Sequence, residues 1–231
     1  EAPAGSIVVL HACCHNPTGA DLTEAQWRDA VDVIRARGLV PFIDMAYQGF
    51  ADGIEADAAV LHLFAEAGLQ FLIASSFSKS FSLYGERVGA LSIVTASRDE
   101  AVRVLSQVKR IVRTNYSNPP THGGAIVAAV LTNPELRGLW EDELAGMRSR
   151  IRAMRVGLVD KLRARGVTED FSFVMRQRGM FSYTGLTVRQ VERMRADFGI
   201  YAVSTGRICV AALNSRNIDY VASAIAAAVE D

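Results

Sequence analysis

The sequence predicts an α/β protein in which a larger first part is followed by a smaller α+β part. Short apolar runs typical of buried strands alternate with segments of helical periodicity in the first half of the chain. A long helical run follows, and then alternating strands and helices. At 231 residues the chain can bury a sizeable core, as one large domain or two smaller ones.

The elements of the first part follow from these patterns. We expect strands at 7–10, 39–43, 70–74 and 88–94. We expect helices at 23–37, 56–67 and 98–114, and a further one that ends at residue 131. Thr23 and Gln26 have the spacing of a capping box, which marks the start of the first helix.

The second part is predicted to begin within a long helix at 134–165. A strand at 179–184, a helix at 187–198, a strand at 207–211 and a final helix at 218–229 follow. We therefore predict a large domain at 1–145 and a small C-terminal domain at 146–231, joined by the long helix. Many arginines lie on one side of that helix, and a solvated face is the favoured interpretation.

Composition excludes several classes of function. The formal net charge is zero, so nothing indicates a nucleic acid or an anionic membrane as a partner. No apolar run is long enough to span a bilayer, and the first residues do not resemble a signal peptide. Cys13, Cys14 and Cys209 do not form a disulfide framework, and no metal site is predicted. A reducing cytoplasm is the expected location.

The segment 76–79 is the most informative motif. Lys79 follows an apolar run, and a lysine there is costly to bury as a cation unless its amine is used. The hydroxyls of Ser76 and Ser78 and the guanidinium of Arg87 are groups that bind phosphate. An amine beside a phosphate clamp indicates pyridoxal 5′-phosphate held as a Schiff base. Taken alone, the segment is also compatible with a solvated loop.

Three further segments favour the cofactor. Asn16 lies in an Asn-Pro-Thr-Gly turn after the first strand, where open α/β sheets bind ligands. Asp44 follows the second strand and can keep a pyridine nitrogen protonated, with Tyr47 three residues later. Arg207 adjoins an apolar strand and suits a carboxylate. The alternatives are a plain turn, a helix cap and an exposed strand end.

Together these segments resemble the fold-type I aminotransferases, and within them the aspartate and aromatic amino-acid aminotransferases. The resemblance implies a three-layer large domain of the pyridoxal-phosphate transferase type and a small α+β domain. The matching pieces, in family order, are 13–19, 44–50, 76–79 through 86–89, 115–120, 179–182 and 206–207.

The resemblance also implies roles for single residues. Lys79 resembles the lysine that binds the cofactor covalently, and Asp44 the partner of the ring nitrogen. Asn16 and Tyr47 resemble the pair that binds the phenolic oxygen of the ring. The phosphate ligands implied are Ser76 and Arg87, with Ser78 assisting. The substrate ligands implied are Arg207, Phe181, Asn16 and, from a neighbouring subunit, Arg113. His11 and His15 are either near Asp44 or ordinary loop histidines.

The implied activity is ping-pong transamination of aromatic and dicarboxylic L-amino acids (tyrosine, phenylalanine and aspartate) with 2-oxoglutarate. The local sequences of segments 16–23, 81–87 and 177–186 resemble those of bacterial aromatic-amino-acid aminotransferases more than those of strict aspartate enzymes. An aspartate-specific enzyme is the alternative. A lyase or decarboxylase of the same fold type is disfavoured, because it has no general need for two carboxylate-binding arginines.

The resemblance further implies that about 170 residues of a homodimeric parent precede Glu1, among them a small-residue phosphate loop and a ring-stacking aromatic. The chain is therefore expected to be a C-terminal fragment. A fragment without catalysis is the second alternative for its function.

Overall fold

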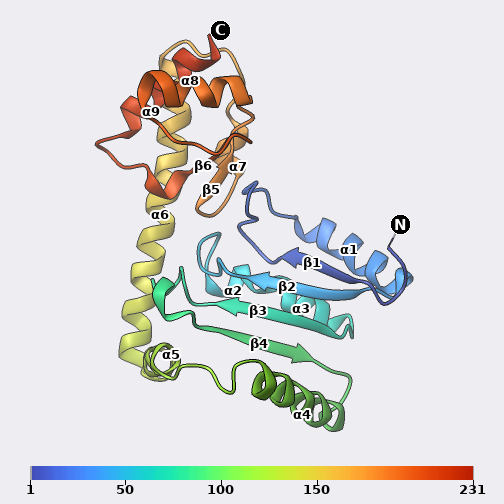
Figure 1. Cartoon of the computed structure of the whole chain (residues 1–231). Helices are drawn as coiled ribbons and strands as arrows, with labels where there is room; N and C mark the ends of the chain where they lie inside the picture. The colour runs from blue at the N-terminus through green and yellow to red at the C-terminus, as the bar shows by residue number, and fades with distance from the viewer. Residues whose placement is uncertain (1, 231) are drawn as a thin grey trace. The chain divides into compact units, whose positions relative to one another are not determined.

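The computed structural model describes residues 2–230, and Figure 1 labels their elements. The chain divides into two compact units. Unit 1 comprises the residues up to Ala12 with Leu22–Gly49 and Gly53–Leu144, and unit 2 comprises Cys13–Asp21, Phe50–Asp52 and the residues from Ala145 onward. The expected α/β class is confirmed. The assignment of 1–145 and 146–231 as domains remains a proposal.

Unit 1 is built on a four-stranded sheet in the order β1-β2-β3-β4. The strands are β1 (Ile7–His11), β2 (Val40–Met45), β3 (Phe71–Ser76) and β4 (Gly89–Val94). The first three are parallel and β4 is antiparallel to β3. The carboxyl ends of β1, β2 and β3 therefore meet at one edge, which is where open α/β sheets place ligands.

The helices of unit 1 are α1 (Glu24–Arg37), α2 (Ile54–Asp57), α3 (Ala59–Glu66), α4 (Arg98–Asn115), α5 (His122–Thr132) and the beginning of α6 (Pro134–Ala164), with a short 3₁₀ turn, η1 (Tyr84–Glu86). The predicted capping box of Thr23 and Gln26 is confirmed at the start of α1. The helix expected at 56–67 is instead two helices, α2 and α3.

One face of the sheet carries the core of unit 1. Trp27 of α1 and Phe71 of β3 both contact the ring of Phe64 of α3 edge to face, with centroid distances of 5.8 and 5.6 Å. Ile43 of β2 is fully buried in the same cluster. The helices α1 and α3 thus cover this face, as Figure 1 shows. Burial of each of these side chains stabilises the folded state by about 1.5–3 kcal/mol.

The remaining apolar side chains of unit 1 are less well covered. Ile7 and Val9 of β1 are 64% and 62% exposed, and α4 contains no buried residue. Within residues 2–230, no helix is long and apolar enough to cross a membrane.

Unit 2 contains the C-terminal part of α6 together with α8 (Val188–Phe198) and α9 (Ile218–Val229), and α8 packs against α9, as seen in Figure 1. A short helix α7 (Phe173–Arg176), which the sequence patterns did not indicate, leads to the antiparallel pair β5 (Phe181–Tyr183) and β6 (Arg207–Cys209). The strand expected at 207–211 ends early, because residues from Val210 to Ala212 form a 3₁₀ turn, η2.

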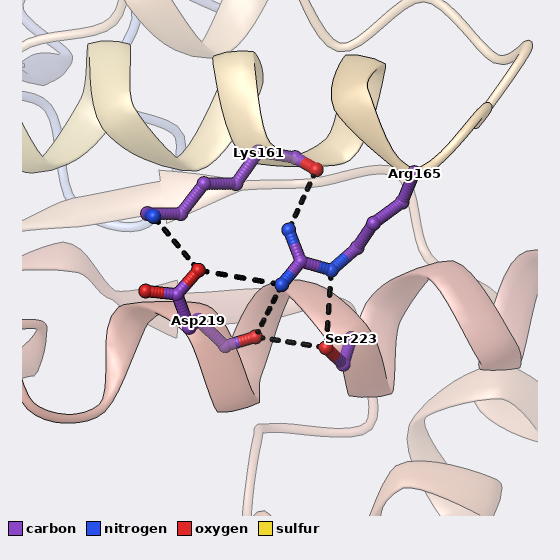
Figure 2. A network of polar contacts seen from close by, with 4 residues as sticks. All are labelled: Lys161, Arg165, Asp219 and Ser223. Carbon is purple, nitrogen blue, oxygen red and sulfur yellow. Dashed lines mark hydrogen bonds and ion pairs between the residues drawn. The ribbon is translucent and has the colours of Figure 1, made fainter.

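Polar side chains join α6 to α9, as Figure 2 shows. Lys161 donates to the Asp219 carboxylate at 2.7 Å, and Arg165 reaches the same oxygen at 3.3 Å. Arg165 also donates to the Ser223 hydroxyl at 3.0 Å. The hydrogen bond from Lys161, helped by Arg165, lowers the pKa of Asp219 below its usual value.

The interpretation of the α6 arginines as a solvated face is wrong for one of them. Arg155 is 2% exposed and ranks with the largest fully buried side chains among residues 2–230. Arg152 and Arg163 of the same helix have side chains that are 55% and 58% exposed, so helical periodicity alone did not separate the two kinds of arginine.

Candidate functional site

The lysine loop lies at the carboxyl-end edge of the sheet in unit 1. Lys79 comes three residues after the end of β3, and its ammonium nitrogen lies 4.7 Å from the centroid of the Tyr47 ring. Tyr47 is buried and follows β2, which contains Asp44. Asp44 pairs in register with Ala74 of β3, and its carboxylate accepts the Ala46 amide at 2.9 Å. Two adjacent parallel strands therefore present the predicted amine, phenol and carboxylate.

Aromatic side chains hold the loop of Lys79 against α6. Phe81 stacks on Trp140 of α6 at 4.6 Å and contacts Phe77 edge to face at 5.5 Å. The indole nitrogen of Trp140 donates to the Ser80 carbonyl at 2.7 Å. Because a stacked ring and a hydrogen bond both restrain the residue after Lys79, the backbone of the loop is held in one conformation.

A buried carboxylate holds the turn after Tyr47. Asp57 is 5% exposed and accepts the Gly49 amide at 2.8 Å and the Gly53 amide at 3.3 Å. These bonds satisfy a charge that would be costly to bury alone. The turn that carries Tyr47 is thereby tied to the start of α2.

The predicted phosphate ligands are partly grouped. Ser76 accepts the amide of Ser78 at 3.3 Å and lines a cavity of about 230 Å³ in unit 1. Arg87 is exposed, donates to the Tyr84 carbonyl at 2.9 Å and has a left-handed backbone with φ of 52°. That conformation costs a non-glycine residue about 1–2 kcal/mol, and such strain concentrates at functional sites.

These residues fit the cofactor that the sequence indicates. Pyridoxal phosphate needs an amine, a carboxylate for its ring nitrogen, and hydroxyl and guanidinium donors for its phosphate. Unit 1 supplies the carboxylate, the amine and the hydroxyls at or just after β2 and β3, and the guanidinium of Arg87 shortly before β4. Within residues 2–230, no cluster of side chains suits a metal ion.

Unit 2 brings together three of the predicted substrate ligands, Arg207, Asn16 and Phe181. Arg207, at the start of β6, donates to the side-chain oxygen of Asn16 at 3.0 Å. Its guanidinium lies 4.8 Å from the centroid of the Phe181 ring on β5. An arginine stacked on an aromatic ring and held by an amide is restrained in orientation, which suits bidentate binding of a carboxylate.

The loop that carries Asn16 is held by its own residues. The carboxylate of Asp21 accepts the amides of Cys14 and His15 at 2.7 and 2.8 Å. Gly19 accepts the Arg178 amide through its carbonyl at 2.7 Å, and a Cβ on Gly19 would lie 2.7 Å from the Phe181 carbonyl. Glycine therefore allows this loop to approach the strand β5 closely.

The family follows from comparison with known proteins. The model of the aminotransferase class I and II family matches residues 1–225. The chain belongs to that family.

Named relatives in this aminotransferase family cover both predicted substrate classes. The aspartate aminotransferase of Pseudomonas aeruginosa is 68% identical over 96% of this chain, and the aromatic-amino-acid aminotransferase of Escherichia coli is 52% identical over 97%. The chain spans 56% and 57% of the length of these two relatives.

Comparison with solved structures also finds an aminotransferase. The aromatic-amino-acid aminotransferase of Burkholderia pseudomallei, described as covalently bound to pyridoxal phosphate, is 70% identical, with a TM-score of 0.97. The match covers 98% of this chain and 57% of that one.

Arg113 is the predicted aminotransferase residue that lies apart. It is on the exposed helix α4 and donates to the Ser117 hydroxyl at 2.5 Å. Its role toward a neighbouring subunit stays a prediction. His11 pairs in register with Asp44, which agrees with a place near that carboxylate, whereas His15 contacts the Thr18 hydroxyl at 2.7 Å.

Sequence reasoning missed four supporting residues: Asp21, Asp57, Trp140 and Arg155. Asp21 follows the Asn-Pro-Thr-Gly turn, and an aspartate beside a turn commonly binds backbone amides, so a local signal existed. Asp57 likewise binds nearby amides, those of Gly49 and Gly53, so a local signal existed there too. Trp140 and Arg155 act on segments distant in sequence, and nothing local distinguishes them from ordinary helical residues.

Proposed function

We propose that the whole protein is a pyridoxal-phosphate-dependent aminotransferase, which exchanges an amino group between an L-amino acid and a 2-oxo acid. The observation that carries this proposal is the Lys79 amine over the Tyr47 ring, with Asp44 on the same pair of strands. The family membership and the cofactor named for the Burkholderia relative support it.

Each residue of unit 1 has a chemical task in this proposal. Bound pyridoxal phosphate supplies a ring that accepts an electron pair. Lys79 holds the cofactor covalently through its amine, and the same amine, when unattached, takes and returns the Cα proton of the substrate. Asp44 keeps the ring nitrogen protonated, and Tyr47 binds the phenolic oxygen. Ser76, Ser78 and Arg87 bind the phosphate.

The residues of unit 2 act on the substrate. Arg207 binds the α-carboxylate in both half-reactions, Asn16 orients its guanidinium, and Phe181 forms an apolar wall. We further propose that Asn16 also donates to the phenolic oxygen of the cofactor. In a homodimer, Arg113 of one subunit serves the distal carboxylate of a dicarboxylic substrate in the other. A sedimentation measurement on the whole protein tests the dimer, and a monomer would remove the role of Arg113.

For the substrates we propose tyrosine, phenylalanine and aspartate, with 2-oxoglutarate as the acceptor. The 68% identity to an aspartate aminotransferase favours a narrower alternative, specificity for aspartate. Comparison of kcat/KM for tyrosine and aspartate separates the two. Values within about tenfold support a dual enzyme, whereas tyrosine turnover below about 1% of aspartate turnover supports the narrower one. The proposed location is the cytoplasm.

The test of cofactor binding uses absorption and mass spectrometry. The whole protein is mixed with pyridoxal phosphate, reduced with borohydride and digested. A near-visible band and a reduced adduct on Lys79 are expected, with no adduct on Lys109, an exposed lysine of α4. An adduct elsewhere, or none, would contradict the proposal. The same measurement on the 231-residue chain tests the alternative of a catalytically inactive fragment.

A further inference from the structure

Arg155 of α6 is buried without a carboxylate partner among residues 2–230. Its guanidinium donates to the carbonyls of Phe181 at 2.6 Å and Gly179 at 2.7 Å. Longer bonds of 3.2 Å reach the Val174 carbonyl and the Ser182 hydroxyl. Its Nε atom is buried and has no hydrogen-bond partner in the described chain. Within the described part of the chain the cation therefore has no ion pair, and three of its four acceptors are backbone carbonyls.

Burying a guanidinium in this way costs desolvation free energy. Burial lowers the pKa of Arg155 to about 10, and the neighbouring Cys14 and Asp21 oppose this only in part. At neutral pH it still carries its charge. An apolar side chain of similar volume would fill the same space without desolvating a cation. What it cannot supply is a fork of donors aimed at several carbonyls at once.

The carbonyls that Arg155 binds belong to the segment that supports Arg207. Phe181 has its ring against the Arg207 guanidinium, and Tyr183 pairs in register with Arg207 across β5 and β6. At the other end of the segment, a Cβ on Gly179 would lie 2.4 Å from the Cβ of Cys14, two residues before Asn16. The segment therefore adjoins both partners of the guanidinium.

We propose that Arg155 is a positioning residue for substrate binding. Its guanidinium holds residues 179–182 in place, so that Phe181 and Asn16 orient Arg207 toward a carboxylate. This inference rests on the proposed function only in the identity of the carboxylate, which would be that of an amino acid or a 2-oxo acid.

Arg165, the residue directly after α6, provides a matched control. It also donates several hydrogen bonds, one to the carbonyl of Lys161 and others to Ser223 and Asp219, and Figure 2 shows that the latter reach α9. Its partners belong to neither segment that holds Arg207. The variant Arg165→Met should therefore lower the melting temperature and leave carboxylate binding unchanged.

The test compares the whole protein with its Arg155→Met, Arg155→Lys and Arg165→Met variants. Binding of succinate, a dicarboxylate that cannot transaminate, is measured by calorimetry. Hydrogen exchange is followed in peptides covering 177–184. We expect Arg155→Met to weaken succinate binding about tenfold and to speed exchange in that segment. Arg155→Lys should lie between it and the wild type, because lysine keeps the charge and loses the fork.

Kinetics separate positioning from a general loss of structure. In Arg155→Met, KM should rise by a similar factor for the amino acid and the oxo acid, because Arg207 serves both. The reduced cofactor adduct on Lys79 should still form, because Lys79 belongs to unit 1. If Arg155→Met does not fold, Arg155→Lys decides through the same measurements.

Two results would overturn the inference: unchanged exchange with unchanged succinate affinity in the Arg155 variants, or an equal loss of affinity in Arg165→Met. Failure of the wild type to bind succinate would also overturn it, since no carboxylate site would need positioning. A wild type that binds succinate but does not transaminate would refute the proposed function alone.

Discussion

The two units hold their key arginines in different ways. Arg207 in unit 2 is oriented by Asn16 and Phe181, which lie 191 and 26 residues away in sequence. Arg87 in unit 1 is oriented by its own left-handed backbone and a bond to the Tyr84 carbonyl three residues before it. The direction of one guanidinium depends on packing between distant segments, and that of the other on a local turn.

This difference determines which substitutions should change the orientation of each arginine. Arg207 should respond to changes far from it, provided that they move the loop of Asn16 or the strand β5. Arg87 should respond to changes in its own turn and little else. In unit 1 it is the loop of Lys79 that is held by a distant residue, because Phe81 of that loop packs on Trp140.

The largest expected effect tests unit 1. Lys79→Ala removes the amine that attaches the cofactor and moves the proton, so kcat should fall at least about 100-fold and the near-visible band should disappear. Turnover and absorption of the whole protein are the measurements. Lys109→Ala, on exposed α4, is the control and should retain both. Normal turnover in Lys79→Ala would refute the assignment of the site.

The next effect tests unit 2. Arg207→Ala removes a charged donor to the substrate carboxylate, and charged hydrogen bonds contribute about 1.5–3 kcal/mol each. The kcat/KM should therefore fall by roughly 100-fold for both substrates, while the reduced cofactor adduct on Lys79 should still form. Arg207→Lys should recover only part, because lysine lacks the bidentate fork. A loss confined to one of the two substrates would contradict a shared carboxylate ligand.

Much of this arrangement was predictable from sequence, and the reason is local. In unit 1, Asp44 lies near the end of one apolar strand and Lys79 follows the next, and parallel strands bring their carboxyl ends to one edge. Thr23 and Gln26 fixed the start of α1 by spacing alone.

The remainder depended on packing between distant segments. Arg155 sits among arginines of the same helix that are solvated, and only the carbonyls of residues 174–181 distinguish it. The burial of Arg155 could therefore not be inferred from its neighbours in sequence. The break between α2 and α3 follows Asp57, whose partners Gly49 and Gly53 are close in sequence but lie outside any periodic pattern.

A smaller effect sharpens the comparison in unit 1. Trp140→Phe keeps an aromatic ring against Phe81 and deletes the hydrogen bond to the Ser80 carbonyl. The free energy of unfolding should fall by about 1–3 kcal/mol, because that carbonyl loses its partner. Denaturant unfolding of the whole protein measures this. The absorption of bound cofactor should also shift if the loop of Lys79 moves, and an unchanged spectrum would show that stacking alone holds the loop.

The smallest effect concerns the contact between α6 and α9 in unit 2. Asp219 has a pKa below its usual value because Lys161 and Arg165 donate to it. A carboxyl whose pKa is lower in the folded state stabilises that state above its unfolded pKa, near 3.9, and this contribution is lost as the pH falls through the folded value. Asp219→Asn should therefore lower the melting temperature slightly at pH 7.

The pH dependence separates this charge effect from a loss of shape. At a pH below the folded pKa of Asp219 the wild-type carboxyl is protonated, so the wild type and Asp219→Asn should melt nearly together. Asp160→Asn, which removes a weaker pair with Arg163 at 3.8 Å, is the control and should change little at either pH. A difference for Asp219→Asn that is as large in acid as at pH 7 would mean that geometry, and not charge, joins α6 to α9. Arg165→Met would then report only on packing between α6 and α9. That would make it a cleaner control for the Arg155 variants.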